Sequence, residues 1–260
     1  MKAHPGDAAA EEPARHLSFE RCLNFRDLGG YAGWDGRRLR WRRLFRSMTP
    51  EYMTERDLCL ARRLDIGIVI DLRGPRFVTS GPLGEPPARR VVLGGRRGWR
   101  RSQEERRRMI EAPPEVALPA YLERMAPSFV RAVRVMPGAP GAVLVHCRLG
   151  KDRTGILSAV LLKLVGVADA DVIADYMASA PFTAPALQLV REAERNNPED
   201  QIHTESRVSN EPPKPEAMEA VLARLEELGG ARRFLEERGA SPRTLDRLVK
   251  KLLEDGYRAE

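Results

Sequence analysis

A cysteine and an arginine separated by five residues are the side chains in this sequence whose types and spacing best suit a chemical reaction. They begin and end the segment CRLGKDR, residues 147–153. The apolar run GAVLVHC leads into this segment, and Thr154, Gly155 and a second apolar run follow it. Strand, glycine-containing loop and helix in this order form the layout of a phosphate-binding turn. The spacing therefore predicts a cup that binds a tetrahedral dianion.

Each part of this loop has a physical reason to bind phosphate. Successive backbone N–H groups of such a loop can point inward, and the helix that follows adds the partial positive charge of its N-terminus. The guanidinium of Arg153 can bind two phosphate oxygens at once, and Gly150 allows a backbone conformation that a side chain would block. The expected phosphate-binding residues are therefore Arg148, Leu149, Gly150, Lys151, Asp152 and Arg153.

Cys147 lies at the base of this predicted cup, beside N–H donors, a helix N-terminus and Arg153. These three features favour the thiolate, which is the nucleophilic form of cysteine. His146 and Thr154 are expected to tune the thiolate further by hydrogen bonding. A lone cysteine at a strand end is more often an inert core residue. The strand, the glycine, the arginine and the Thr-Gly pair together favour the catalytic interpretation.

The rest of the chain predicts the elements that would hold this loop. Continuous β-branched residues indicate a strand buried on both faces at 66–72, and further strands are expected at 38–47, 90–93 and 141–147. Thr54 followed by Asp57 predicts the start of a helix that ends near residue 64. The other helices are expected at 102–110, 115–136, 156–165, 169–178, 184–196, 215–228, 231–238 and 241–254. This order indicates an α/β core with a helical C-terminal portion.

The segment HCRLGKDRTG resembles the P-loop of protein-tyrosine phosphatases, in particular the bacterial and fungal tyrosine/serine phosphatase group. The chain is similar to this group at further positions, namely NFRDLGG at residues 24–30, Asp71-Leu72-Arg73, Asp175-Tyr176 with Ser179, and the pattern of residues 218–253. The resemblance spans roughly residues 20–255. The P-loop motif is the most specific of these features, and NFRDLGG is the next.

The resemblance implies an α/β fold with a protein-tyrosine-phosphatase-like central sheet flanked by helices. It implies a single phosphatase domain over residues 18–260, with a core of about 18–168 and a helical C-terminal portion of about 169–256. Residues 1–17 are rich in Ala, Glu and Pro, and they are expected to form a disordered tail.

The implied activity is a cysteine-dependent phosphatase reaction in two steps, with no cofactor and no metal. Cys147 takes the phosphoryl group to form a phosphocysteine, and water then releases phosphate, while Arg153 and the loop amides stabilise both transition states. The leaving group needs a general acid. Asp152 is the first candidate, as the Gly-Lys-Asp-Arg subgroup suggests. Asp71 is the second, although an aspartate at a strand end often only caps loop amides.

The residues around the cup leave the substrate open. Arg148 and Lys151 would suit phosphoinositide head groups as well as phosphotyrosine, or they are solvated loop charges. Arg26 and Asp27 are expected to support the loop from behind rather than to touch the substrate. Members of the group commonly carry a glutamate four residues after the arginine of Asp-Leu-Arg. Phe77 stands there in this chain, which indicates a changed rim.

Positive charge is concentrated before the loop. The chain has a net charge of +7, and residues 37–108 alone hold 20 Arg against 8 Asp and Glu. A coding bias toward arginine explains the count but not this asymmetry. We therefore predict that part of the Arg-rich segment 89–108 lies near the mouth of the cup, where it attracts a dianion. Only Trp41 and Trp99 lie in the basic stretches, so the interleaved aromatic residues of a nucleic-acid interface are missing.

Composition excludes several other classes of protein. No apolar run approaches the ~20 residues of a membrane span, and the N-terminus lacks the apolar core of a signal peptide. Three cysteines are too few for a disulfide scaffold or a zinc cluster. We expect a cytoplasmic phosphatase of phosphotyrosine on proteins, with the oligomeric state open. The competing hypotheses are a phosphoinositide phosphatase and a non-catalytic phosphate-binding protein.

Overall fold

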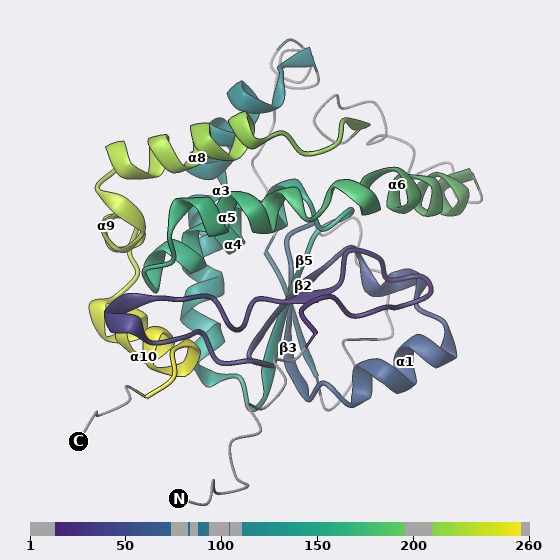
Figure 1. Ribbon diagram of the computed structural model, residues 1–260, viewed down its shortest axis with the longest axis horizontal. Helices are drawn as coiled ribbons and strands as arrows, with labels where there is room; N and C mark the ends of the chain where they lie inside the picture. The colour runs from purple at the N-terminus through teal and green to yellow at the C-terminus, as the bar shows by residue number, and fades with distance from the viewer. Residues whose placement is uncertain are drawn as a thin grey trace, which may run out of the picture.

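A five-stranded sheet runs through the centre of the protein, and helices cover both of its faces (Figure 1). The computed structural model describes residues 14–73, 83, 88–93, 104, 111–195 and 210–255. The strand order is β1-β2-β5-β3-β4, formed by Arg26–Asp27, Leu44–Ser47, Ala142–His146, Ile66–Asp71 and Arg89–Val92. β1 pairs antiparallel with β2, and the other neighbouring strands are parallel. The α/β fold class is therefore confirmed.

Helices connect and follow these strands in the described part of the chain. The α-helices are α1 (Glu55–Arg62), α3 (Pro114–Val135), α4 (Asp152–Leu164), α5 (Asp169–Met177), α6 (Ala180–Arg195), α8 (Pro215–Glu227), α9 (Gly230–Glu236) and α10 (Pro242–Leu252). Short 3₁₀ turns lie at Trp34–Gly36, Pro50–Tyr52 and Met136–Gly138. Among the described residues, no helix combines the length and the apolar character needed to span a membrane.

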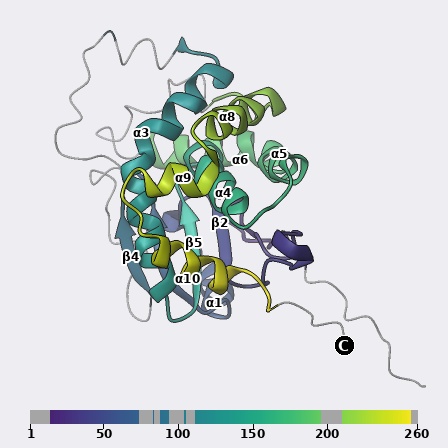
Figure 2. The same ribbon diagram turned by 90° about the vertical axis from the view of Figure 1, so that its left-hand side faces the viewer.

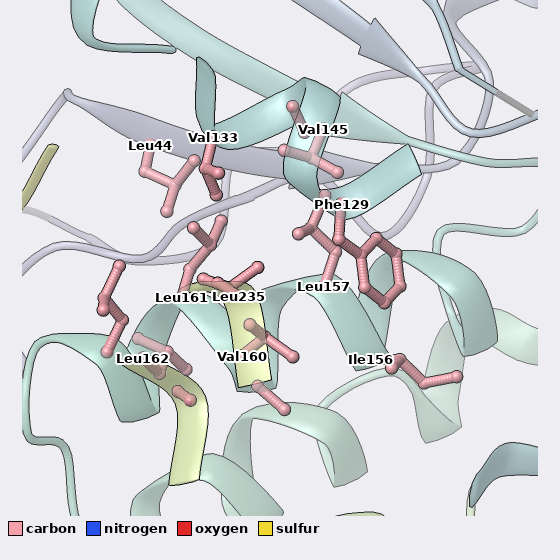
Figure 3. Packing of buried hydrophobic residues seen from close by; sticks show 14 of the residues in the cluster. Leu44, Phe129, Val133, Val145, Ile156, Leu157, Val160, Leu161, Leu162 and Leu235 are labelled. Atoms are coloured by element: carbon pink, nitrogen blue, oxygen red, sulfur yellow. The ribbon is translucent and has the colours of Figure 1, made fainter. Parts of the chain in front are cut away.

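The two faces of the sheet support two different sets of helices. Side chains of successive strand residues point to opposite faces, so Val143 and Val145 of β5 face one cluster of buried residues and Leu144 faces the other. The first cluster contains residues of α3, α4, α5, α8, α9 and α10, and Figure 3 shows Phe129, Val133, Leu157, Leu161 and Leu235 packed together in it. The second cluster is smaller and contains residues of α1 and α6.

The C-terminal helices share their core with the sheet. α8 packs against α3, and α9 packs against α4, and Figure 2 shows α8 and α9 beside these two helices. A bridge between Leu39 and Leu253 joins the end of the chain to the segment before β2. The helical portion expected after residue 168 is therefore a layer of the same packed unit.

The start of α1 agrees with the cap that the sequence predicts, whereas the start of α4 does not. Thr54 caps α1 in a capping box with Asp57, and Ser241 caps α10. α4 begins at Asp152 rather than near residue 156, because the polar end of the P-loop segment already has helical geometry. This places Asp152 and Arg153 in the first turn of the helix, where the macrodipole is strongest.

The strand expected at 38–47 is shorter than predicted. β2 covers only Leu44–Ser47, because the chain turns at Trp41 and Arg42 before it. Arg42 has φ of 58°, and its N–H donates to the Asp27 carboxylate at 2.6 Å. The left-handed backbone at this residue ends any extended segment. The helix expected at 102–110 lies almost entirely outside the described residues.

The described part of the chain begins at residue 14, inside the tail that was expected over residues 1–17. Arg15 donates to the carbonyl groups of Asp27 and Gly29, and the N–H of Leu17 donates to Phe25 at 3.0 Å. His16 forms a bridge with Arg26 beside β1. Residues 14–17 therefore pair with the NFRDLGG segment, and the rest of the expected tail lies outside the described residues.

Candidate active site

Three parallel strands end at the same edge of the sheet and bring the site together. In the register of the sheet, Ser47 of β2 and Asp71 of β3 both lie beside His146, the last residue of β5. Cys147 follows His146 directly, and α4 begins five residues later at Asp152. We call residues 147–153 the P-loop. It therefore lies at the carboxyl edge of the sheet, where open α/β sheets bind ligands.

The backbone of the P-loop has one consistent orientation. The carbonyl oxygens of residues 147–151 all lie within hydrogen-bond distance of a nitrogen group. The carbonyl of Cys147 lies near His146 Nδ1, and that of Arg148 accepts from the Thr49 N–H. The carbonyl of Leu149 accepts from Asn24 Nδ2, and the carbonyls of Gly150 and Lys151 accept from the Arg46 guanidinium. In a trans peptide the carbonyl and the next N–H point in opposite directions. The five following amides therefore face the inside of the loop, as an anion site requires.

Gly150 makes this curvature possible. Its φ is 68°, in the left-handed region that glycine adopts without strain. A Cβ at this position would lie 2.3 Å from the Ser47 carbonyl group of β2. The P-loop therefore packs directly on the end of β2, and a side chain would push it off. The sequence-based role of Gly150 agrees with this geometry.

Two buried arginines hold the P-loop from behind. Arg46 of β2 donates to the carbonyl oxygens of Gly150 and Lys151 at 2.7 and 3.3 Å. Arg26 of β1 donates to the side chain of Asn24, whose amide in turn holds the carbonyl of Leu149 at 3.1 Å. Each arginine is at most 2% exposed. Arg26 therefore supports the loop from behind, as expected from the sequence.

Asp175 of α5 neutralises both of these arginines. Its two carboxylate oxygens bind Arg26 and Arg46 separately, with Arg26 Nε at 2.8 Å. Burial alone would raise the pKa of Asp175, but the charges of Arg26 and Arg46 outweigh it and lower the pKa below the ordinary value. Burial lowers the pKa of Arg46 to about 10, so this side chain is still charged at neutral pH. The three residues form one buried ionic network.

Asp27 has a structural role in the same segment. Its carboxylate accepts hydrogen bonds from the N–H of Gly29 at 2.8 Å and of Arg42 at 2.6 Å. These bonds fix the turns on either side of the pairing between β1 and β2. Asp27 therefore shapes the segment that carries Arg26 and Arg46, and among the described residues it makes no hydrogen bond to the P-loop.

Cys147 and Arg153, the expected nucleophile and phosphate-binding arginine, lie at the two ends of the P-loop. Cys147 is 4% exposed and belongs to the first cluster of buried residues. Arg153 is half-buried in the first turn of α4, and its guanidinium donates to the carbonyl of Leu72 at 3.0 Å. This bond ties Arg153 to the end of β3. Cys147 and Arg153 are thus fixed by neighbouring strands of one sheet.

The two candidate acids have opposite environments. Burial raises the pKa of Asp152, against the opposing effects of Lys151 and Arg153. Burial alone would also raise the pKa of Asp71, but its contacts with His146, Arg73 and Arg90 bring it well below the ordinary range. Asp71 Oδ2 lies 2.9 Å from Arg73 and 2.6 Å from Arg90. Asp152 is therefore the carboxyl group whose surroundings favour holding a proton.

His146 and Thr154 are both buried. Nδ1 of His146 lies 3.0 Å from the carbonyl oxygen of Cys147, so Nδ1 carries the proton and orients the start of the P-loop. Burial lowers the pKa of His146 to about 4, which leaves the ring neutral at pH 7. Thr154 Oγ1 has no hydrogen bond to any described residue, so the expected hydrogen bond to the nucleophile is not present.

Lys151 and Arg148, the charged residues beside the cup, are more buried than the sequence suggests. Lys151 is 1% exposed, its ammonium donates to the carbonyl of Glu211, and it lies 3.7 Å from Asp152 Oδ1. The interpretation of Lys151 as a solvated loop charge is therefore wrong. Arg148 is half-buried. Neither residue is a fully exposed loop charge.

The structure describes only part of the predicted rim of the cup, which comprises Phe77 and the Arg-rich segment 89–108. Arg90 of β4 binds Asp71 and so belongs to the network at the end of β3. Most of the Arg-rich segment 89–108 lies outside the described residues, as does Phe77, so the prediction that this segment lines the mouth stays a prediction. Arg73 binds both oxygens of Glu51 at 2.6 and 2.8 Å.

Sequence reasoning missed Arg46, which holds two of the five P-loop carbonyls. The sequence signal for Arg46 was a charged residue directly after Leu44 and Phe45 in an expected strand, since buried charges in proteins are normally paired. Glu51 and Asn24 were also missed as individual contributors. Among the described residues, no group of three His, Cys, Asp or Glu side chains is arranged to hold a metal.

Sequence comparison agrees with this architecture. The chain matches the model of the tyrosine phosphatase family over residues 17–254 and belongs to that family. It is 33% identical over 201 residues to a protein of Cupriavidus necator named as a tyrosine-protein phosphatase, a match that covers 69% of the chain and 70% of the relative. A tyrosine-protein phosphatase of Nostoc commune is 37% identical over 79 residues, or 29% of the chain and 27% of that protein.

Among solved structures, the complex of P. aeruginosa TpbA with pTyr matches with a TM-score of 0.34 and 18% identity, over 54% of this chain and 71% of TpbA. This likeness is too distant to carry an argument. The family model and the relatives named as tyrosine-protein phosphatases assign the chain to the phosphatases.

The Asp175 network predicts a specific response to acid. Because the folded-state pKa of Asp175 lies below its ordinary value of 3.8, its stabilising effect is complete above that value and is lost as the pH falls through the folded pKa. We expect Asp175→Asn to lower the free energy of unfolding by about 3–5 kcal/mol at pH 7. We also expect Asp175→Asn to reduce the pH dependence of the free energy of unfolding below about pH 5.

Urea unfolding of both proteins between pH 7 and pH 3 measures this effect. Asp35→Asn is the matched control, because Asp35 is an exposed aspartate whose ion pair with Arg37 lies at the surface. A variant Asp175→Asn with the stability and pH slope of the wild type would contradict the role given to the network.

Proposed function

We propose that the chain hydrolyses phosphomonoesters in two steps through a phosphocysteine, with phosphotyrosine on proteins as its substrate class. The observation that carries this proposal is the orientation of the P-loop, whose five consecutive carbonyl groups are bound from outside while the amides face inward beside Cys147. Such an array stabilises the charge of a transferring phosphoryl group without reorganising.

In the first step, the Cys147 thiolate attacks phosphorus and forms an S–P bond while the P–O bond to the leaving group breaks. The inward amides and the Arg153 guanidinium hold the three remaining oxygens. Asp152 transfers its proton to the leaving oxygen. In the second step, water attacks phosphorus, the S–P bond breaks, and the Asp152 carboxylate takes a proton from that water, which returns the site to its starting state.

The choice of Asp152 over Asp71 rests on protonation. A general acid must hold a proton near the working pH. The raised pKa of Asp152 supports this role, and the ion pairs of Asp71 with two arginines oppose it. His146 is neutral and bonded to the backbone, so it orients the loop and does not act as the acid.

The surroundings of Lys151 support the proposed substrate class. A phosphoinositide site would use this lysine for further phosphate groups, but its ammonium is bound to the carbonyl of Glu211 and lies close to Asp152. This arrangement supports a substrate with one phosphate. The names of the relatives, which are tyrosine-protein phosphatases, point the same way. A non-catalytic phosphate-binding protein would not need the nucleophile and the acid, and the chain retains both.

Replacement of the nucleophile tests the reaction. We expect Cys147→Ser to reduce the hydrolysis of an aryl phosphate at least about a thousandfold, because an uncharged hydroxyl is a much weaker nucleophile than a thiolate. Cys59→Ser is the control, since Cys59 is an exposed free cysteine, and it should retain wild-type turnover. If Cys147→Ser hydrolysed the substrate at the wild-type rate, the phosphocysteine route would be excluded.

The effect of replacing Asp152 on turnover is expected to depend on the leaving group of the substrate. We expect Asp152→Asn to lower kcat for phenyl phosphate by about a hundredfold or more. An aryl phosphate with a strongly acidic phenol should be nearly unaffected, because its leaving group needs no proton. Asp71→Asn should keep the same leaving-group dependence as the wild type. The opposite result, with turnover lost in Asp71→Asn and kept in Asp152→Asn, would reverse the assignment of the two aspartates.

Substrate preference is measured directly. We expect a higher kcat/KM for a phosphotyrosine peptide than for a phosphoserine peptide or for phosphoinositides in vesicles, because the bound Lys151 is not available to further phosphate groups. Cys147→Ser serves as the blank for each substrate. A higher kcat/KM for phosphoinositides would favour the alternative function with the same chemistry.

A further inference from the structure

The hydroxyl of Tyr176 lies next to the carboxyl group of Asp152. Tyr176 belongs to α5, is 1% exposed, and donates its O–H to Asp152 Oδ1 at 3.4 Å. The ammonium of Lys151 lies 3.7 Å from the same oxygen. Two donors therefore approach Oδ1, whereas no described residue makes a hydrogen bond to Oδ2. The two oxygens of this carboxyl group have different environments.

The position of the tyrosine ring depends on Gly155. A Cβ on Gly155 would lie 2.9 Å from Cδ2 of the Tyr176 ring, which is closer than real Cβ contacts. Gly155 is buried in the first turn of α4, directly after Asp152, Arg153 and Thr154. A side chain there would displace the ring and carry its hydroxyl away from Asp152. The glycine that ends the P-loop motif thus allows contact between α4 and α5.

We propose that Tyr176 is a positioning residue for the general acid, because its hydroxyl holds Oδ1 of Asp152 and leaves Oδ2 to carry the transferable proton. This inference rests on the proposed role of Asp152. It adds α5 to the parts of the protein that set the chemistry, since α5 otherwise only supports the P-loop through Asp175. Tyr176 acts through Asp152 and does not touch the phosphoryl group.

The charges around Tyr176 and Asp152 determine how loss of the Tyr176 hydroxyl changes the pKa of Asp152. Burial raises the pKa of Tyr176, so the phenol keeps its proton and remains a donor over the working range. Asp152 faces Lys151 and Arg153 from its own loop and helix, and Tyr176 from α5, while Arg46 of β2 acts on Tyr176. A hydrogen bond from Tyr176 stabilises the carboxylate that remains after proton transfer. Its loss makes Asp152 a weaker proton donor.

The variant Tyr176→Phe removes the hydroxyl and keeps the ring in the core. We expect kcat for phenyl phosphate to fall about tenfold, which is a part of the full contribution of a general acid. We expect no change for an aryl phosphate with a strongly acidic phenol. Activity that needs protonated Asp152 is lost as the pH rises through its pKa, so the basic limb of the pH profile should move to higher pH in the variant.

Tyr31→Phe is the matched control. Tyr31 is partly buried against the same core cluster, but its ring lies against Arg15 and its hydroxyl makes no hydrogen bond with a described residue. Its variant should keep the rate and the pH profile of the wild type. Thermal unfolding of both variants shows whether each is folded, and a merely structural role of Tyr176 would lower the rate for both leaving groups without moving the limb.

A double-mutant cycle with Asp152→Asn separates the inference from the proposed function. If Tyr176 acts through Asp152, then adding Tyr176→Phe to Asp152→Asn lowers kcat for phenyl phosphate no further. A tenfold loss in both backgrounds would overturn the role of Tyr176 and leave Asp152 as the acid. Full turnover of phenyl phosphate by Asp152→Asn alone would instead overturn the acid assignment and, with it, this inference.

Discussion

The buried carboxylate of Asp175 is the interaction on which the P-loop depends. It neutralises Arg26 and Arg46, and these arginines hold the P-loop carbonyls directly or through Asn24. A buried charge without a partner would cost several kcal/mol, so the two arginines could not stay behind the loop without it. The inward direction of the amides is thus a consequence of charge pairing on the opposite side of the backbone.

The surroundings of Asp71 and Asp152 differ and act differently on these two carboxyl groups. Asp71 is fixed as an anion by Arg73 and Arg90, which makes it part of the support at the end of β3. Asp152 lies in the first turn of α4 with its side chain 13% exposed, and nearby positive charges only partly offset the rise that burial causes in its pKa. Burial therefore raises the pKa of Asp152, whereas charge pairing lowers the pKa of Asp71, so one fold shifts two aspartates in opposite directions.

Much of this arrangement could be predicted from local sequence, and the rest could not. The strand ending at Asp71, the cap at Thr54 and the P-loop itself have short-range signals, because neighbouring residues determine them. The partners of Arg46 lie more than 100 residues later in the chain, so no local pattern indicates them. The turn at Arg42 was missed because its left-handed backbone is stabilised by Asp27, a distant side chain.

The long separation between Asp175 and its two arginines has a consequence for the growing polypeptide. Arg26 and Arg46 leave the ribosome more than 120 residues before their carboxylate does. An emerging chain that ends before α5 does not yet contain the carboxylate that neutralises these two arginines. Nascent chains therefore lack the complete ionic support of the P-loop until α5 has been synthesised.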